Sequence, residues 1–189
     1  EFSRDNFSKT RIFVSGLEYA TKYYWRVQSK NSQSTSDWSQ VFSFTTMGQP
    51  PVAITAPSQY VLSYLQEGDQ CYTDRDYTIY SLPSGLQNNL SIKVANADKK
   101  NSSANYIAFN LSEPAILYIA YDQRSSLPPD WLNSGFVPTD KKLVILELDG
   151  SLTVLELWKK TLQPGVHVLG GNLAAGAVGA AINYLVLFG

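Results

Sequence analysis

The chain has very few of the residues that build metal centres and acid–base dyads. Among its 189 residues there is one cysteine, Cys71, and one histidine, His167. A structural zinc site needs four Cys or His ligands, and a disulfide within the chain needs two cysteines. His167 has no second histidine and no carboxylate near it in sequence with which to form a catalytic dyad. Zinc sites, intrachain disulfides and Ser–His triads are therefore excluded, and we expect Cys71 to be buried.

Charge is also scarce and balanced. Charged residues make up 16% of the chain, with 15 Lys and Arg against 16 Asp and Glu, whereas soluble domains average about 25%. A protein that binds nucleic acid carries a basic excess to neutralise phosphates. We therefore expect no nucleic-acid partner.

The residues that are abundant are typical of secreted β-rich modules. Aromatic residues reach 13%, with 12 Tyr and a single Met, and Ser, Thr, Asn and Gln are frequent. The start at Glu1 has no basic segment before an apolar stretch, so it lacks the pattern of a signal peptide. We expect a piece of a longer polypeptide that is extracellular or at the cell surface, with the periplasm as an alternative.

Apolar and polar residues alternate along most of the chain, which predicts strands and no long helix. Asp149-Gly150 lies between two such runs and predicts a hairpin turn. The fold class we predict is all-β. The predicted strands are residues 11–14, 23–27, 41–45, 60–65, 77–80, 90–94, 106–111, 115–121, 143–148, 152–158, 166–169 and 182–188.

Two proline-containing segments predict a boundary between two modules. Gly48-Gln49-Pro50-Pro51 is followed closely by Ala56-Pro57-Ser58, and such segments form stiff, non-helical spacers. We predict a first module over residues 1–47, a linker over 48–58 and a second module over 59–189.

The first module resembles the C-terminal half of a fibronectin type III domain. The residues that carry the resemblance are Val14 to Leu17, Thr21 to Val27, Asn31, Trp38-Ser39 and Phe42 to Thr46. The resemblance implies a partial immunoglobulin-like sandwich, in which the Tyr23 hydroxyl bonds back to the backbone upstream. Such sandwiches have about seven strands, and this sequence contains only the segments that correspond to the last three. We expect either a fragment or a domain whose other strands come from another segment or chain.

The second module resembles a β-sandwich unit found at the ends of secreted, multidomain bacterial proteins that carry fibronectin type III repeats and polysaccharide-acting domains. The resemblance implies a jelly-roll-like antiparallel β-sandwich, an extracellular location and contact with carbohydrate, but no known reaction. Its landmarks, in order, are Gly68-Asp69, Tyr72 to Tyr77, Leu82-Pro83 with Leu86, Tyr118 to Arg124, Leu127 to Leu132, and Pro164 to Val166 with Leu169 to Asn172.

Four residues of these landmarks form the candidate ligand site. Tyr121, Asp122 and Arg124 end a predicted strand, and the following loop brings back Trp131. A carboxylate, a guanidinium group and an indole can together hold a sugar, since the ring stacks and the charges bond hydroxyls. The alternative is that Asp122 and Arg124 pair internally while Trp131 plugs the end of the sandwich.

Acidic residues early in the second module form a candidate calcium site. Asp69, Asp74 and Asp76 lie within eight positions of one another, and Ca²⁺ takes six to eight oxygen ligands. Arg75 lies between two of them, so a salt-bridged turn without metal is the alternative. No other cofactor is expected. A catalytic carboxylate pair would need an open cleft, which nothing in the sequence predicts, so we name no catalytic residue.

The C-terminal segment is free of charge from Gly165 to Gly189. A membrane-spanning helix needs about 20 apolar residues, and the Asn and Gly residues of this segment argue against one. A buried last strand entered by a Gly/Ala loop is one interpretation. The other is an exposed apolar loop that docks on a partner through Leu173, Ala177 and Val178, since exposed apolar loops are costly in water.

Together these features favour a non-catalytic, extracellular interaction and assembly module that contacts other protein chains or other domains of a parent protein. The alternative is a carbohydrate-binding module of a polysaccharide-degrading enzyme, with polysaccharide as the partner.

Overall fold

The computed structural model describes residues 14, 16–48 and 50–189. The chain divides into two compact units, Glu1–Pro50 and Pro51–Gly189, called here the hairpin unit and the sandwich unit. All residues of the sandwich unit are described. Among the described residues of both units, no helix combines the length and apolarity that crossing a membrane requires.

The hairpin unit contains an antiparallel pair of strands, β1 (Lys22–Trp25) and β2 (Phe42–Thr45). Aromatic rings stack across the pair, Tyr23 on Phe44 and Trp25 on Phe42. The Tyr23 hydroxyl accepts a hydrogen bond from the Glu18 amide at 2.9 Å, which is the backbone contact that the sequence predicted for this tyrosine. Residues 11–13 of the first predicted strand lie outside the described residues, and the fibronectin assignment stays a prediction.

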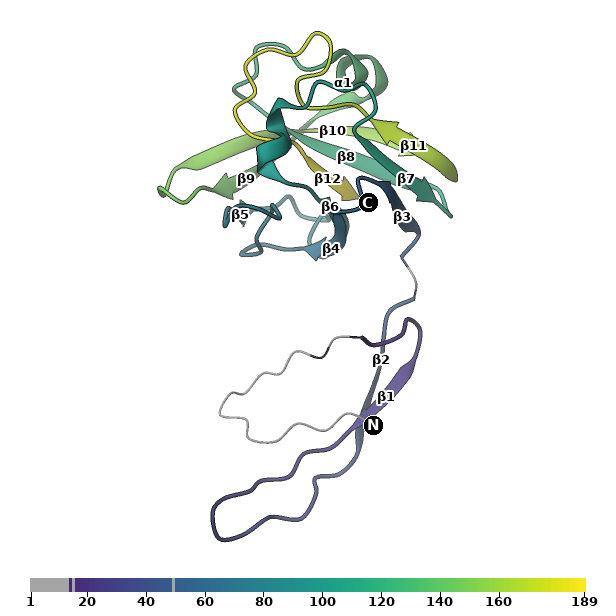
Figure 1. Ribbon diagram of the computed structural model, residues 1–189, viewed down its shortest axis with the longest axis vertical. Helices are drawn as coiled ribbons and strands as arrows, with labels where there is room; N and C mark the ends of the chain where they lie inside the picture. The colour runs from purple at the N-terminus through teal and green to yellow at the C-terminus, as the bar shows by residue number, and fades with distance from the viewer. Residues whose placement is uncertain (1–13, 15, 49) are drawn as a thin grey trace. The chain divides into compact units, whose positions relative to one another are not determined.

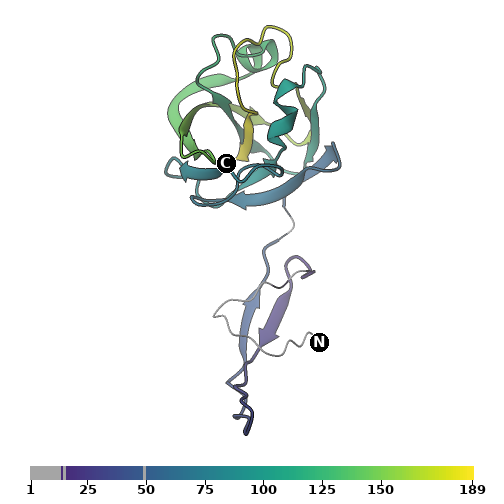
Figure 2. The same cartoon turned by 60° about the vertical axis from the view of Figure 1, so that its left-hand side comes forward.

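The sandwich unit is built from two antiparallel sheets (Figure 1). The larger has seven strands in the order β4-β6-β12-β8-β10-β9-β5 and curls strongly (Figure 2). The smaller has the order β11-β7-β3. This architecture confirms the predicted all-β class and the antiparallel β-sandwich. The strands are β3 (Val52–Ala56), β4 (Val61–Leu65), β5 (Thr78–Ser81), β6 (Asn89–Lys93), β7 (Ile107–Leu111), β8 (Ala115–Asp122), β9 (Val137–Leu146), β10 (Leu152–Leu162), β11 (Gly165–Leu169) and β12 (Leu185–Phe188).

The core lies between the two sheets and follows the alternation of the strands. On β10, Leu155 and Leu157 are fully buried, while the intervening residues are partly exposed. The four residues of β12 are all buried, so both faces of this strand, which lies between β6 and β8 in the larger sheet, are covered. Phe109 of the smaller sheet meets Phe188 of the larger sheet edge to face, with ring centroids 5.5 Å apart. Contacts of this kind hold the sheets together.

One strand occupies residues that the sequence placed in the linker 48–58. β3 pairs with β7 from Val52 opposite Leu111 to Ala56 opposite Ala108, and Val52 is buried. Proline is tolerated beside an edge strand, where its missing N–H disrupts no ladder. The prolines at 50, 51 and 57 therefore flank β3 without breaking it.

Two short helices were not predicted, and two strands begin at other residues than predicted. The helices are α1 (Asp130–Gly135) and the 3-10 turn η1 (Asn96–Lys100), both in stretches without a clear period. β9 begins at Val137 rather than at 143, and β12 begins at Leu185 rather than at 182. The hairpin predicted at Asp149-Gly150 connects β9 to β10, and Gly150 adopts a positive φ of 84° there.

Candidate functional site

Tyr121 and Asp122 end β8 with their side chains inside the sandwich rather than facing solvent. Each residue is 2% exposed. The Tyr121 hydroxyl donates a hydrogen bond to the Asn172 carbonyl oxygen at 2.9 Å. Burial raises the pKa of the Tyr121 hydroxyl to about 12, so the group stays protonated. Tyr121 therefore has no free polar atom for a ligand.

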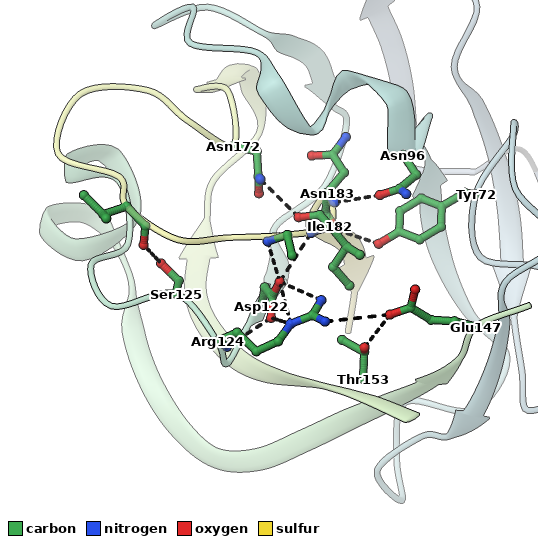
Figure 3. A network of polar contacts seen from close by, with 12 residues as sticks. Tyr72, Asn96, Asp122, Arg124, Ser125, Glu147, Thr153, Asn172, Ile182 and Asn183 are labelled. Carbon is green, nitrogen blue, oxygen red and sulfur yellow. Dashed lines mark hydrogen bonds and ion pairs between the residues drawn. The ribbon is translucent and has the colours of Figure 1, made fainter. Parts of the chain in front are cut away.

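The carboxylate of Asp122 is held on both oxygens (Figure 3). Arg124 donates from Nε to Oδ1 at 2.9 Å and from Nη2 to Oδ2 at 3.0 Å. The Ala181 amide donates to Oδ2 at 2.7 Å. Burial acts to raise the pKa of Asp122, but the hydrogen bonds from Arg124 and from Ala181 outweigh it and the pKa is lowered. The hydrogen bond from Ala181 connects the end of β8 to the segment that leads into β12. Asp122 is therefore an ionised residue with a structural role.

Trp131 closes the same end of the sandwich from α1. Its indole N–H donates to the Gly171 carbonyl oxygen at 3.0 Å, and its ring lies 5.4 Å from that of the buried Tyr184. A Cβ atom on Gly170 would lie 2.3 Å from the Trp131 ring, and one on Gly171 would lie 2.2 Å from the Asn101 carbonyl oxygen. Both glycines are therefore required for this close packing.

These contacts favour internal pairing at three of the four residues predicted for a sugar site. The structure brings Tyr121, Asp122, Arg124 and Trp131 to one end of the sandwich, but it uses the polar atoms of Tyr121, Asp122 and Trp131 internally. Internal pairing, the alternative that the sequence also allowed, describes these three residues. Arg124 differs, because 49% of its side chain is exposed.

The predicted calcium ligands Asp69, Asp74 and Asp76 each accept hydrogen bonds from protein donors. Asp74 accepts hydrogen bonds from the Asn96 and Ala97 amides, Asp69 accepts from the Gln66 amide and Asp76 accepts from the Gln70 side chain. Within the described part of the chain, no three His, Cys, Asp or Glu residues are grouped to hold a metal ion. Asp69 and Asp76 therefore stabilise the turns that precede β5, and Asp74 connects this segment to the start of η1.

The apolar segment 173–180 forms a surface pad with the loop 125–129. The Val178 amide donates to the Leu127 carbonyl oxygen at 2.9 Å, and the Leu127 amide donates back at 3.3 Å. Val178 is 54% exposed and Leu127 is 46% exposed, while Leu173 and Ala177 are partly buried. Of the three residues predicted for a partner interface, Val178 presents the most surface.

A hollow of about 260 Å³ opens beside Arg124, lined by Gln123, Arg124, Leu152, Thr153 and Val154. Glu147 lies next to it, with its Oε1 accepting from the Thr153 hydroxyl at 2.5 Å and lying 3.9 Å from Arg124 Nη1. Lys142 donates to the Gln123 side-chain oxygen at 3.1 Å. The hollow therefore places the guanidinium group of Arg124 beside the apolar side chains of Leu152 and Val154, whereas Glu147 contacts Arg124 and Thr153 without lining it.

Sequence reasoning named Arg124 but missed Glu147, Thr153 and Lys142. One signal was available for Thr153, which shares the core-facing side of its strand with Leu155 and Leu157. A hydroxyl at a core position needs a polar partner, and this one has Glu147. Nothing in the sequence indicated the contact between Lys142 and Gln123, because Lys142 lies on β9 and Gln123 follows β8, 19 residues earlier.

The solved structures that resemble this chain include two carbohydrate-active enzymes. The first is a β-glucuronidase from glycoside hydrolase family 2, with a TM-score of 0.62 and 12% identity over 89% of this chain and 21% of that chain. The second is a GH138 enzyme targeting pectin rhamnogalacturonan II, with a TM-score of 0.50 and 15% identity over 68% of this chain and 16% of that one. No protein-family model and no curated protein matches the chain. The resemblance supports the β-sandwich fold, and the chain spans only a small part of either enzyme.

Proposed function

We propose that the chain is a non-catalytic, carbohydrate-binding accessory module of a larger, extracellular carbohydrate-active polypeptide. The observation that carries the proposal is the hollow beside Arg124, where a half-exposed guanidinium group is held in place by the buried carboxylate of Asp122 and lies beside the apolar side chains of Leu152 and Val154. The resemblance of the fold to parts of two carbohydrate-active enzymes adds support. Small pockets with a few convergent polar groups are typical of binding sites.

The state of Asp122 supports the non-catalytic part of the proposal. A glycosidase needs a carboxylic acid that is protonated at its working pH and an open cleft between two carboxyl groups. The pKa of Asp122 is lowered, and its oxygens accept hydrogen bonds from Arg124 and Ala181. Asp122 therefore cannot act as the acid, and Glu147 next to it already bonds Thr153.

Affinity electrophoresis of the full chain in gels containing soluble polysaccharides tests the proposal. We expect at least one polymer to retard the chain, with no release of reducing sugar from that polymer. Equal mobility in every polymer would overturn the binding function. Release of sugar by the purified chain, lost on substitution of Glu147→Gln, would overturn the non-catalytic assignment.

Assembly is a second candidate function, favoured by the exposed pad around Leu127 and Val178. For this function we propose a second copy of the chain as the partner, since a pad made of uncharged residues can face itself. Sedimentation equilibrium of the full chain tests it. The wild type should associate with increasing concentration, Val178→Asp should not, and the control Val166→Asp, on β11, should behave like the wild type. A monomeric wild type at all concentrations would contradict the candidate.

A further inference from the structure

The hairpin formed by β9 and β10 carries apolar residues on its solvent side. Leu152 and Val154 alternate with buried residues of β10 and therefore point away from the core. Their cross-strand partners on β9 are Leu146 and Val144. These four residues are called here the β9–β10 face. Leu152 is 51% exposed and the other three are partly exposed, so the face presents apolar surface to water.

A long polar side chain flanks the β9–β10 face on each side. On the β8 side, the main-chain amide of Gln123 donates to the Val154 carbonyl oxygen at 3.1 Å. On the β5 side, Tyr80 is the extra residue of a bulge between Ile79 and Ser81, which pair with successive residues of β9. Ile79 is 1% exposed and Tyr80 is 58% exposed, so the phenol ring points to the solvent side.

The next row of the hairpin offers hydrogen-bonding groups without net charge. Glu156 and Lys142 are cross-strand partners in this row. The Lys142 ammonium group donates to the Gln123 side-chain oxygen at 3.1 Å and so extends toward the hollow. One cation and one anion leave the row neutral, and both groups can bond hydroxyls, which donate as well as accept. The surface thus combines apolar area with hydroxyl partners.

The dimensions of this surface suit a ligand longer than one sugar ring. From Leu152 to Glu156 the strand rises about 14 Å, and the four neighbouring segments from Gln123 to Tyr80 span about 14 Å. The surface therefore covers on the order of 200 Å², far less than the roughly 800 Å² per partner of a stable protein complex. The hollow of about 260 Å³ is one corner of it, because Gln123, Leu152 and Val154 line the hollow.

We propose that the β9–β10 face binds an internal segment of an extended, uncharged polysaccharide with a cellulose-like or xylan-like backbone, which runs along the hairpin. The CH faces of consecutive rings pack on Leu152 and Val154, and Gln123 and Tyr80 bond hydroxyl groups from the two sides. The inference rests on the proposed carbohydrate-binding function and gives it a ligand class.

Amide chemical shifts of the ¹⁵N-labelled full chain test the inference, in titrations with cellotetraose, xylotetraose and mannotetraose and with the corresponding monosaccharides. We expect at least one tetrasaccharide to shift the signals of Tyr80, Val144 and Val154. It should bind at least about tenfold more tightly than its monosaccharide, because only the longer ligand reaches several rows. A monosaccharide that binds as tightly as its tetrasaccharide, or no shift at these residues with any tetrasaccharide, would overturn the inference.

Two variants with matched controls locate the ligand. Tyr80→Ala removes a ring and a hydroxyl and should weaken tetrasaccharide binding by about fivefold or more. Leu152→Asp places a charge under the apolar face of the sugar and should weaken it by about tenfold or more. The controls are Tyr64→Ala on β4, at the opposite edge of the same sheet, and Val166→Asp on β11 of the smaller sheet. Tyr64 is 41% exposed and Val166 is 71% exposed, and both controls should bind like the wild type.

All four substituted side chains are exposed, so the variants should remain folded, which their amide spectra check. Equal binding by all four variants would place the ligand elsewhere and overturn the inference. Loss of self-association in Leu152→Asp, in the absence of sugar binding, would assign the β9–β10 face to a protein contact and would also overturn it.

The polysaccharide gels separate this inference from the function on which it rests. If a polymer retards the wild type, Tyr80→Ala and Leu152→Asp equally, the inference fails while the binding function stands. If no polymer and no tetrasaccharide binds, both fail. Retardation that is reduced in Tyr80→Ala and lost in Leu152→Asp, but kept in the two controls, supports both.

Discussion

The strands of the hairpin unit and of the sandwich unit both alternate apolar and polar residues, yet their aromatic side chains differ in how much of their surface is exposed. On β1 and β2, Trp25 is 47% exposed and Phe44 is 45% exposed, although their rings stack on neighbours across the hairpin. On β7, Phe109 is fully buried against Phe188 of the other sheet. Two strands satisfy cross-strand pairing, but burial requires a second layer. An alternating pattern therefore indicates a strand without showing how much of it is covered.

The largest expected effect comes from truncating one aromatic residue in each unit. Phe109→Ala should lower the free energy of unfolding of the sandwich unit by about 3–5 kcal/mol, because it leaves a cavity between the sheets. Phe44→Ala should change the free energy of unfolding of the hairpin unit by less than about 1 kcal/mol. Urea unfolding followed by NMR on the amide signals of each unit measures both. Similar losses in the two variants would contradict the distinction between the units.

A smaller effect is expected at the closed end of the sandwich. Asp122→Asn should cost about 3 kcal/mol at pH 7, because Arg124 and the Ala181 amide lose a buried anion. The pKa of Asp122 is lowered, so its contribution is present above the unfolded pKa of about 3.9 and is lost as the pH falls through the folded pKa. Thermal unfolding from pH 7 to pH 2 checks this.

The matched control for Asp122 is Asp140→Asn on β9, an exposed aspartate. It should change stability by less than about 0.5 kcal/mol and should keep the acid dependence of the wild type. If Asp122→Asn showed the wild-type acid dependence as well, the stabilising role of the pair would be wrong.

The smallest effect is expected at alkaline pH. Burial raises the pKa of the Cys71 thiol to about 12, against about 8.5 when unfolded. Its contribution to stability is full below pH 8.5 and declines as the pH rises toward 12, by about 1 kcal/mol at pH 9.5. Chemical unfolding at pH 8 and pH 9.5 should show a larger decline in the wild type than in Cys71→Ala, which keeps the smaller decline caused by buried tyrosines such as Tyr72 and Tyr184, whose pKa values burial also raises. Equal declines in both proteins would rule out the thiol as its source.

The strands were largely predictable, and the exceptions share a cause. Strands such as β8 and β10 alternate over long stretches, and the hairpin at Asp149-Gly150 carries its own turn signal. β3 was hidden because its flanking prolines indicate a linker, and only pairing with β7 makes it a strand. α1 was hidden because two prolines precede it and it spans only six residues, too few for a helical period to show.

The candidate site was predictable in its residues but not in their orientation. Asp122, Arg124 and Trp131 were recognised as belonging together, and the structure does place them at one end of the sandwich. The sequence left open whether they face a ligand or each other. That choice depends on Ala181 and Gly171, which reach these side chains only in the folded chain.

By itself, the sequence determined the all-β class and excluded intrachain disulfides, because alternation, turn residues and residue counts are properties read along the chain, and a family resemblance added the expectation of a sandwich. Only the tertiary structure decided which side chains are buried and which polar groups remain exposed to solvent. Asp122 became an anchor because a segment 59 residues later supplies its amide donors, and Arg124 stayed half exposed because that anchor holds only one side of its guanidinium group. Contacts between segments so distant in sequence exist only when the whole sandwich is assembled.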